Sequence, residues 1–161
     1  MGPRVKAVLV THLWGLPVDM EAVKEICRPW GAYILEDCSH AYGAEYQGRK
    51  AGTFGDIACF SMQANKAVYA GEGGLLVTSN RRFYERAVTL SSSVQRIFDC
   101  VKEPDYLQYW GTGLGLKLKL NPLGAPLALD ALRQLEEVNQ KRRHRALILE
   151  RAAEDSGIFV L

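Results

Sequence analysis

The chain of 161 residues is 48% hydrophobic and 24% charged, which is the balance of an ordinary globular protein, and its length suits one compact domain with a core of its own. Its formal net charge of +2 is too small to indicate a nucleic acid or a membrane surface as partner. No run approaches the roughly 20 apolar residues of a membrane-spanning helix, and no small-residue cleavage site follows the first apolar run, so we expect neither a membrane anchor nor a secretory signal.

The first third of the chain reads as short apolar strands around one helix. Residues 6–14, KAVLVTHLW, form an apolar, β-branched run that predicts a fully buried strand. Apolar residues recur at helical spacing from Met20 through Trp30, which predicts a helix, and Asp19 just before them can cap it. A second short buried run covers residues 32–37 and ends on two acids. The glycine-rich, polar stretch 43–56 predicts a hairpin-like excursion.

The middle of the chain continues the strand pattern. IACFS at 57–61 predicts a third strand and GLLVTS at 74–79 a fourth, and a helix is expected from about Asn80. The stretch 91–120, with GTGLG near its centre, reads as mostly loop.

The last third is predicted to be helical. Apolar residues recur at helical spacing from Pro122, a second helical stretch covers residues 147–149, and GIFVL at 157–161 resembles the start of a strand. Strands that alternate with helices in this way predict an α/β fold with a mostly parallel sheet.

The cysteines indicate a reducing compartment. No pair has C-x-x-C spacing, and three of the four lie in apolar or helical contexts, where a free thiol behaves as a small hydrophobe. We expect reduced thiols and a cytoplasmic protein. The four residues are Cys27, Cys38, Cys59 and Cys100.

Polar side chains gather where the predicted strands end, and ligands of open α/β sheets bind outside the carboxyl ends of the strands. Asp37 ends the second strand, and His40 follows it. Ser61 ends the third strand, and Lys66 lies in the loop beyond. Each residue alone has an ordinary structural explanation: a turn acid, a hydrogen-bonded core histidine, a turn-capping hydroxyl or a solvated lysine.

As a set, these residues match the needs of pyridoxal phosphate (PLP). A lysine amine forms a Schiff base with an aldehyde. A carboxylate keeps the ring nitrogen of PLP protonated, so that the ring acts as an electron sink. Hydroxyls and backbone N–H groups bind phosphate. Lys66, Asp37 and Ser61 could supply these three groups.

At this point the sequence resembles the DegT/DnrJ/EryC1/StrS aminotransferases, the sugar and cyclitol branch of the fold-type I PLP enzymes. The similarity is closest from about Lys6 to Arg86 and looser to Leu149. It implies a partial large domain of a fold-type I transferase, with a mostly parallel sheet and helices. The motifs that carry it occur in the family's order and spacing: HLWGLPVDMEAV, EDCSHAYGAEYQGRKAGTFGDIACFS, the lysine at 66 and GEGGLLVTS.

The resemblance implies a role for each candidate residue. Lys66 corresponds to the Schiff-base lysine and Asp37 to the partner of the pyridine nitrogen. His40 stands beside the ring hydroxyl of the cofactor, and Ser61 binds its phosphate. The FSMQ segment is similar to the cyclitol-forming and aminohydroxybenzoate-forming branches, which makes Gln63 a further active-site contact.

Two features depart from the family pattern. A later family motif reads Gly-x-Asn-x-Arg, and its asparagine reaches the phosphate of the neighbouring subunit; here residues 115–119 read GLKLK, and Lys117 can meet a phosphate as a point charge. Family members are also considerably longer. We therefore expect residues 1–120 to be part of a PLP-binding large domain and residues 121–161 a helical segment leading to a small domain. The phosphate-cupping turn, the aromatic that stacks on the ring and most of the small domain are expected outside this middle fragment.

The resemblance implies amino transfer to a keto-sugar or keto-cyclitol, with an amino acid as amino donor and a homodimer as the working unit. A second hypothesis is a truncated relative that does not catalyse and acts as a binding or dimerising module, so enzymatic activity stays open. A third, a nucleotide-binding domain, lacks a complete phosphate loop, because no strand leads into GTGLG.

One basic run could indicate nucleic acid. Residues 141–145 read KRRHR. The helix around them also carries Glu136, Glu137 and Glu150. The mixed charges predict a solvated helix face instead.

Overall fold

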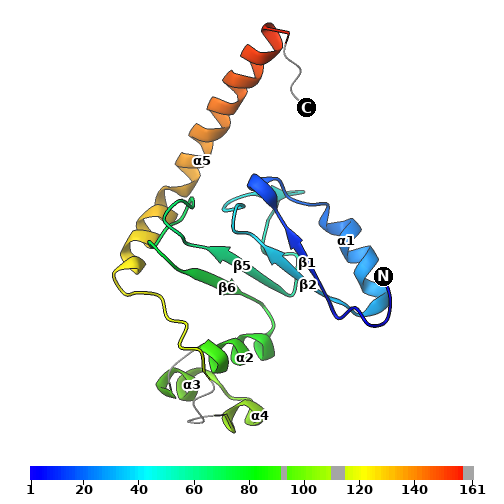
Figure 1. The fold of residues 1–161 in the computed structure, drawn as a ribbon, viewed down its shortest axis with the longest axis vertical. Coiled ribbons are helices and arrows are strands. Elements are labelled where there is room, and N and C mark those ends of the chain that lie inside the picture. Colours follow the sequence, from blue (N-terminus) through cyan, green and yellow to red (C-terminus); the bar gives the residue numbers. More distant parts are fainter. Residues whose placement is uncertain (92–93, 110–114, 158–161) are drawn as a thin grey trace.

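The computed structural model describes residues 1–91, 94–109 and 115–157. Its centre is a four-stranded sheet with the order β1-β2-β5-β6. The first three strands are parallel and β6 runs antiparallel to β5, which confirms the mostly parallel α/β fold (Figure 1). The strands are β1 (Ala7–Thr11), β2 (Tyr33–Asp37), β5 (Ile57–Ser61) and β6 (Gly74–Val77).

One face of this sheet carries the main core. The cap that the sequence predicts is present, because the side chain of Asp19 accepts a hydrogen bond from the Ala22 N–H at the start of α1 (Met20–Cys27). α1 continues into a short 3-10 helix, Arg28–Trp30, and Gly31 ends it in the left-handed conformation. The buried cluster beneath α1 comprises Val10, Met20, Cys27, Ile34 and Phe54.

The opposite face of the sheet is only partly covered, and the prediction of a fully buried strand at 6–14 is wrong. Val8 and Val10 pack toward the α1 side, whereas Leu9 keeps 67% of its surface exposed. Side chains alternate between the two faces of a strand, and on the Leu9 face the ring of Tyr33 packs against Phe83, whereas Leu9 itself stays uncovered. The residues of β6 are all exposed as well.

The hairpin-like excursion is confirmed. β3 (Glu45–Tyr46) and β4 (Arg49–Lys50) pair antiparallel, and Gln47 and Gly48 between them both have positive φ, as a tight two-residue turn requires.

The stretch expected to be mostly loop contains two helices. After α2 (Arg81–Ser91), the chain forms α3 (Val94–Cys100) and α4 (Pro104–Leu107), which pack around a second cluster of Val88, Ile97 and Val101. The carboxylate of Glu85 ties them together: it pairs with Arg81 at 2.5 Å and accepts the Glu103 N–H at 2.8 Å. The contact between Glu85 and Glu103 joins residues 18 positions apart, which local periodicity does not detect.

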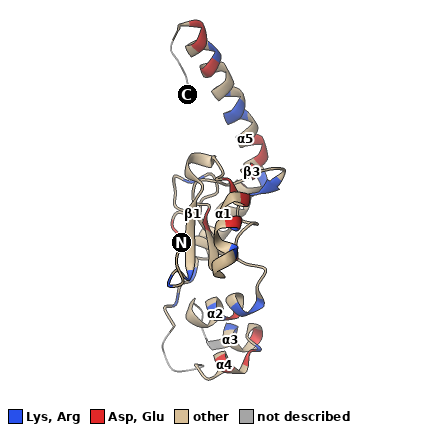
Figure 2. Cartoon of the chain, turned by 90° about the vertical axis from the view of Figure 1, so that its right-hand side faces the viewer, with Lys and Arg blue, Asp and Glu red and all other residues tan. Residues whose placement is uncertain are grey.

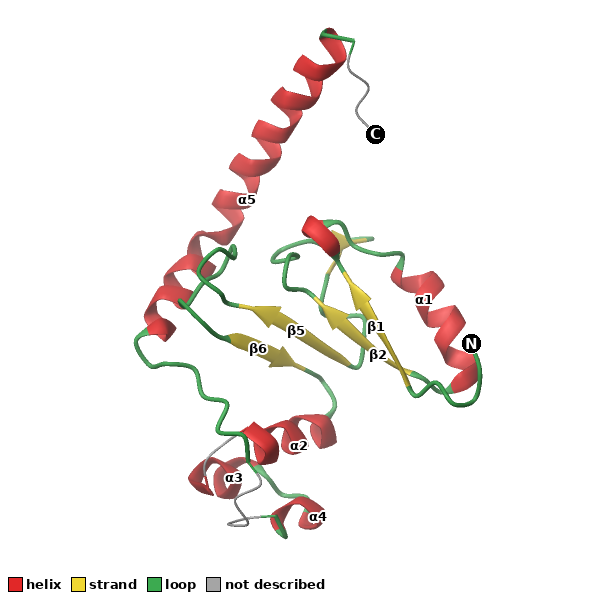
Figure 3. Ribbon diagram, viewed as in Figure 1, coloured by secondary structure: helices red, strands yellow, loops and turns green. Residues whose placement is uncertain are grey.

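The C-terminal region is one helix rather than two stretches. α5 (Gly124–Asp155) begins against the sheet and then projects away from it (Figure 3), with charges of both signs along its exposed length (Figure 2). The expected strand start at 157–161 falls almost entirely outside the described residues. Among the described helices, none has the length and apolarity needed to cross a bilayer. The division at residue 120 into two domains stays a prediction.

Candidate functional site

The candidate residues Asp37 and Ser61 lie at one edge of the sheet. Asp37 ends β2, beside Thr11 of β1 and Cys59 of β5. Backbone hydrogen bonds continue past the strand ends, from His12 N–H to the Asp37 carbonyl at 3.0 Å and from Cys38 N–H to the Cys59 carbonyl at 2.8 Å. The parallel register therefore fixes the backbone position of Asp37 relative to the neighbouring strands.

The Asp37 carboxylate is stabilised in its charged form. The Ser39 side chain makes the largest contribution, and the Ser39 N–H also donates to Asp37 Oδ1 at 2.9 Å. The charges of His40 and Lys66 act in the same direction and outweigh partial burial, so the pKa of Asp37 is lowered. Asp37 is therefore an anion across the neutral pH range, next to two of the other predicted site residues.

The loop that carries Lys66 is closed at its base by hydrogen bonds. Met62 N–H donates to the Gly73 carbonyl at 2.9 Å, and Ala70 N–H donates to the Met62 carbonyl at 2.8 Å. Inside the loop, Lys66 N–H donates to the Gln63 carbonyl at 2.9 Å. The Lys66 side chain is half-buried and lines a cavity together with His40.

Ser61 and Gln63 stand at the entrance to this loop. Ser61 is half-buried and Gln63 is exposed. The Gln63 N–H donates to Ser61 Oγ over 3.4 Å, so the hydroxyl acts there as an acceptor and its own proton is available for another partner.

The start of α5 supports both loops. Gly124 packs against the Ala70 backbone so closely that an added Cβ would lie 2.5 Å from the Ala70 carbonyl oxygen. Further along, Asn139 Nδ2 donates to the Tyr42 carbonyl at 2.9 Å. α5 therefore contacts the segment after Asp37 and the loop of Lys66, although more than fifty residues separate it from either.

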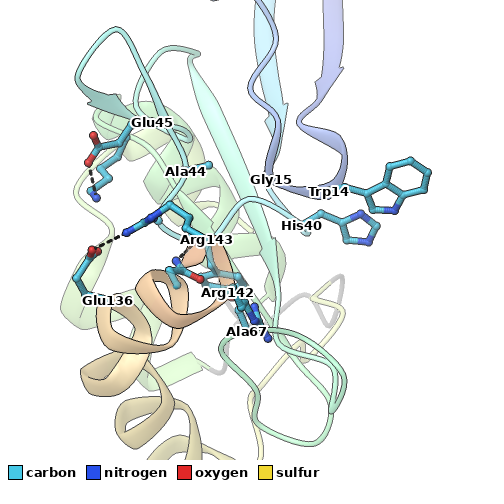
Figure 4. A pocket seen from close by; sticks show the side chains of 13 residues that line it. Trp14, Gly15, His40, Ala44, Glu45, Ala67, Glu136, Arg142 and Arg143 are labelled. Atoms are coloured by element: carbon cyan, nitrogen blue, oxygen red, sulfur yellow. Dashed lines mark hydrogen bonds and ion pairs between the residues drawn. The ribbon is translucent and has the colours of Figure 1, made fainter. Parts of the chain in front are cut away.

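Two adjoining cavities open at this edge of the sheet, of about 560 and 350 Å³. Both are lined by Trp14, His40 and Arg142, and Figure 4 shows the larger of the two. The basic run 141–145 is exposed, as expected for a solvated face. Two of its residues, Arg142 and Arg143, also line the larger cavity. The sequence pattern gave no sign of this, because it depends on where α5 crosses the sheet.

Lys117 lies in a different environment from the other candidates. Its segment runs beside α2, where Leu116 N–H donates to the Leu90 carbonyl at 2.7 Å. Lys117 is exposed, has a positive φ of 50°, and lines neither of the two cavities. Most of the neighbouring GTGLG stretch falls outside the described residues.

A buried hydrogen-bonded pair, His12 and Glu36, was missed by the sequence analysis. His12 Nε2 and Glu36 Oε2 are 3.0 Å apart, and His12 Nδ1 accepts the Val18 N–H at 3.1 Å, which assigns the ring proton to Nε2. The Glu36 oxygens also accept three backbone N–H groups, from Gly52, Phe54 and Gly55, at 2.5 to 2.7 Å. The sequence did contain one sign of it: Glu36 lies inside a strand predicted to be buried, and a buried carboxylate needs hydrogen-bond partners.

This pair and the thiol of Cys38 form the one metal-like cluster found among the described residues, and their chemistry does not favour a metal. Burial, followed by the nearby charges of Glu36 and Asp37, raises the pKa of Cys38 to about 12. Metal ligation requires a thiolate. The histidine nitrogens and the carboxylate oxygens are already engaged in hydrogen bonds. All four cysteines are free, as predicted.

Comparison with known proteins gives a consistent family match. The model of the DegT/DnrJ/EryC1/StrS aminotransferase family matches residues 1–161. An L-glutamine:2-deoxy-scyllo-inosose aminotransferase of Streptoalloteichus tenebrarius is 33% identical over 158 residues, which are 97% of this chain and 37% of that protein. The GDP-perosamine synthase of Escherichia coli O157:H7 is 31% identical over 140 residues, 87% of this chain and 36% of its own length.

Solved structures agree with this match. The Helicobacter pylori aminotransferase PseC, involved in the biosynthesis of pseudoaminic acid, superposes with a TM-score of 0.83 at 29% identity, over 96% of this chain and 40% of PseC. An E. coli GDP-4-keto-6-deoxy-D-mannose-3-dehydratase with bound hydrated PLP gives a TM-score of 0.79 at 21% identity, which shows the fold alone. The chain thus spans less than half the length of the relatives it matches.

Proposed function

Because the chain belongs to the DegT/DnrJ/EryC1/StrS aminotransferase family, we propose that it is the cofactor-holding part of a PLP-dependent enzyme that transfers an amino group to a keto-sugar or keto-cyclitol. One observation carries the proposal. His40 and Lys66 both act electrostatically on Asp37 and line one cavity at the carboxyl edge of the sheet, where ligands of such sheets bind.

The residues at this edge fit the groups of PLP. The cofactor supplies an electron-accepting ring when it is bound. Ser39, His40 and Lys66 lower the pKa of Asp37. Its carboxylate would accept a hydrogen bond from the protonated ring nitrogen. The free hydroxyl proton of Ser61 would bind a phosphate oxygen, and His40 and Gln63 would contact the ring and the substrate.

Lys66 would have two tasks. Its Nζ would hold the cofactor covalently at the aldehyde carbon. Once an amino donor displaces it, the same nitrogen would carry a proton between the substrate carbon and the cofactor. The closed base of its loop restricts where Nζ can reach, which is what positioned proton transfer requires.

The partners are part of the proposal. The name of one relative gives L-glutamine and 2-deoxy-scyllo-inosose as its substrates, and that of another gives GDP-perosamine as its product. We extend the classes, an amino acid as donor and a keto-sugar or keto-cyclitol as acceptor, to this chain. A homodimer would let Lys117 of one subunit approach the phosphate bound by the other. Lys117 lines neither of the two cavities of its own chain, which is compatible with this role.

Covalent trapping tests the proposal. The full chain is incubated with PLP, reduced with borohydride, digested, and its peptides are weighed. We expect the Lys66 peptide to be labelled, and the label to disappear in Lys66→Ala and in Lys66→Arg, which keeps the positive charge. Equal labelling of peptides that contain Lys24, Lys50 and Lys102 would reflect random surface imines and would overturn the assignment.

A second function, that of a binding or dimerising module without catalysis, is favoured by a different observation. Large apolar side chains are exposed on β1, β6 and α5, and contiguous apolar surface marks association sites. If the chain self-associates but no lysine is labelled selectively, this second function replaces the first.

A further inference from the structure

The two cavities beside the Lys66 loop differ in their balance of charge. The smaller, of about 350 Å³, is lined by Lys66 and Arg142 and by no acid of the described chain. Asp37 acts on Lys66 from outside this lining, so among the described residues the cation of the cavity that has no acidic partner is Arg142, and its charge favours an anionic ligand. In the larger cavity, the cations other than Arg142 pair with acids: Lys50 with Glu45, and Arg143 with Glu136.

Arg142 is the cation that the two cavities share. It comes from α5, and its side chain reaches over Ala67, the residue that follows Lys66 (Figure 4). Among the described residues, no ion pair or hydrogen bond engages its guanidinium group. The planar fork of an arginine matches the oxygens of a carboxylate or a phosphate two at a time.

Trp14 provides a second, independent observation at the same place. It lies in the 3-10 turn Leu13–Gly15 after β1, with a positive φ of 53°, and 80% of its surface is exposed. A left-handed backbone is unfavourable for a bulky residue and, where it persists, is found preferentially at ligand sites. In Figure 4 its side chain stands next to that of His40 at the rim of the cavity.

We infer that Arg142, with Trp14 and His40, forms an oxyanion subsite that binds the carboxylate or phosphate group of the substrate. The inference rests on the proposed function, because it places the anionic end of the substrate at Arg142 while the reacting carbon lies at Lys66. Trp14 contributes an apolar face against which the carbon skeleton of the substrate packs. The carboxylate would belong to an amino donor, and the phosphate to a phosphorylated or nucleotide-linked acceptor.

Ligand titration without the cofactor tests the subsite. The indole N–H signal of Trp14, assigned with Trp14→Phe, is followed by NMR in the full chain at constant ionic strength. The probes are glutarate, inorganic phosphate and, as the uncharged match of glutarate, glutaramide. We expect a saturable shift with at least one of the two anions and none with glutaramide. The anion that saturates at the lower concentration identifies the source of the oxyanion.

Two arginine variants decide whether Arg142 is responsible. Arg142→Gln should weaken anion binding by about tenfold or more, the loss expected when a charge-assisted hydrogen bond is removed. Arg133→Gln, nine positions earlier on α5 and thus on the opposite side of the helix, should change it less than about twofold. Equal affinity in Arg142→Gln and the unchanged protein, or no saturable shift with either anion, overturns the inference.

The outcome is separable from that of the proposed function. Binding of an anion that depends on Arg142, without selective labelling of Lys66, would leave the subsite in place and remove the aminotransferase assignment. Selective labelling of Lys66, without anion binding at Arg142, would do the reverse.

Discussion

Glu36 is the residue on which the turn at 52–55 depends. Burial alone would raise its pKa, but the N–H groups of Gly55, Gly52 and Phe54 and the ring of His12 together lower it. Glu36→Gln removes the charge and places an amide N–H₂ where an acceptor is needed. We expect a loss of about 2–4 kcal/mol in the free energy of unfolding, measured in urea, because several buried donors lose their partner.

The dependence of this loss on pH follows from the lowered pKa. A carboxylate with a depressed pKa contributes stability that is fully present above its ordinary value of 4.5 and is lost as the pH falls through the folded-state pKa. The difference in stability between the protein and Glu36→Gln should therefore be constant from about pH 6 upward and shrink below pH 4.5. Exposed Glu25→Gln is the control and should lack this acid-dependent difference.

Asp37, one residue later, is expected to behave in the opposite way. Asp37→Asn keeps the shape and can still accept the Ser39 N–H, but it cannot hold a proton on a pyridine nitrogen. We expect stability to change by less than about 1 kcal/mol, while the rate at which L-glutamine consumes the bound aldehyde, followed by absorbance, falls on the order of a hundredfold. An unstable variant with an unchanged rate per folded molecule would show that Asp37 is structural.

At the scale of the elements, the contact between α5 and the Lys66 loop is the most sensitive. In Gly124→Ala the new Cβ would meet the Ala70 carbonyl oxygen at 2.5 Å and the Ala70 Cβ at 3.0 Å, so the loop or the helix must move. We expect a destabilisation of about 1–3 kcal/mol and weaker labelling of Lys66 by PLP. Both are measurable on the same preparation.

Gly2→Ala is the matched control, because an added Cβ at Gly2 meets no atom within 4 Å. It should leave the stability and the labelling unchanged. If Gly124→Ala also leaves both unchanged, α5 does not hold the loop in solution.

The elements that the sequence predicted well are those whose signals are local. The Asp19 cap, the hairpin at 45–50 and the strand 57–61 follow from side chains close in sequence, and all three are confirmed. The positions of Asp37 and Lys66 at one edge follow from the rule for parallel sheets. The roles assigned to them stay predictions.

The features of the fold and of the site that could not be predicted depend on contacts between residues distant in sequence. The exposure of Leu9 reflects what lies on the far side of the sheet, and the helix at 94–100 is fixed by packing and by the hydrogen bond from Arg81 to the Cys100 carbonyl. Arg142 enters the site only because α5 crosses beside the Lys66 loop. A run of basic residues in a helix looks the same whether or not it reaches a cavity.

At the scale of the whole molecule, the described chain has a core beneath α1 and exposed apolar surface along β6. α1 and the 45–56 region cover one face of β1 and β2, whereas β6 is exposed on both faces, with Leu75 and Val77 on one and Leu76 on the other. A groove of about 610 Å³ runs along β6, between α2 and the segment 116–120. Burial of apolar surface of this kind against another chain is favourable, because it removes the surface from water.

We therefore expect the chain to form a homodimer through this surface. The groove is lined by Leu116 and Leu118, each 68% exposed, on either side of Lys117. Sedimentation equilibrium should give about twice the chain mass of 17.9 kDa. The double variant Leu116→Asp/Leu118→Asp should shift it to monomer, because two charges would be buried without partners. Leu149→Asp, on the projecting end of α5, is the control and should leave the dimer intact. A clean monomer of the unchanged chain at high concentration would contradict the expectation, and it would also remove the route by which Lys117 of one subunit could reach the site of another.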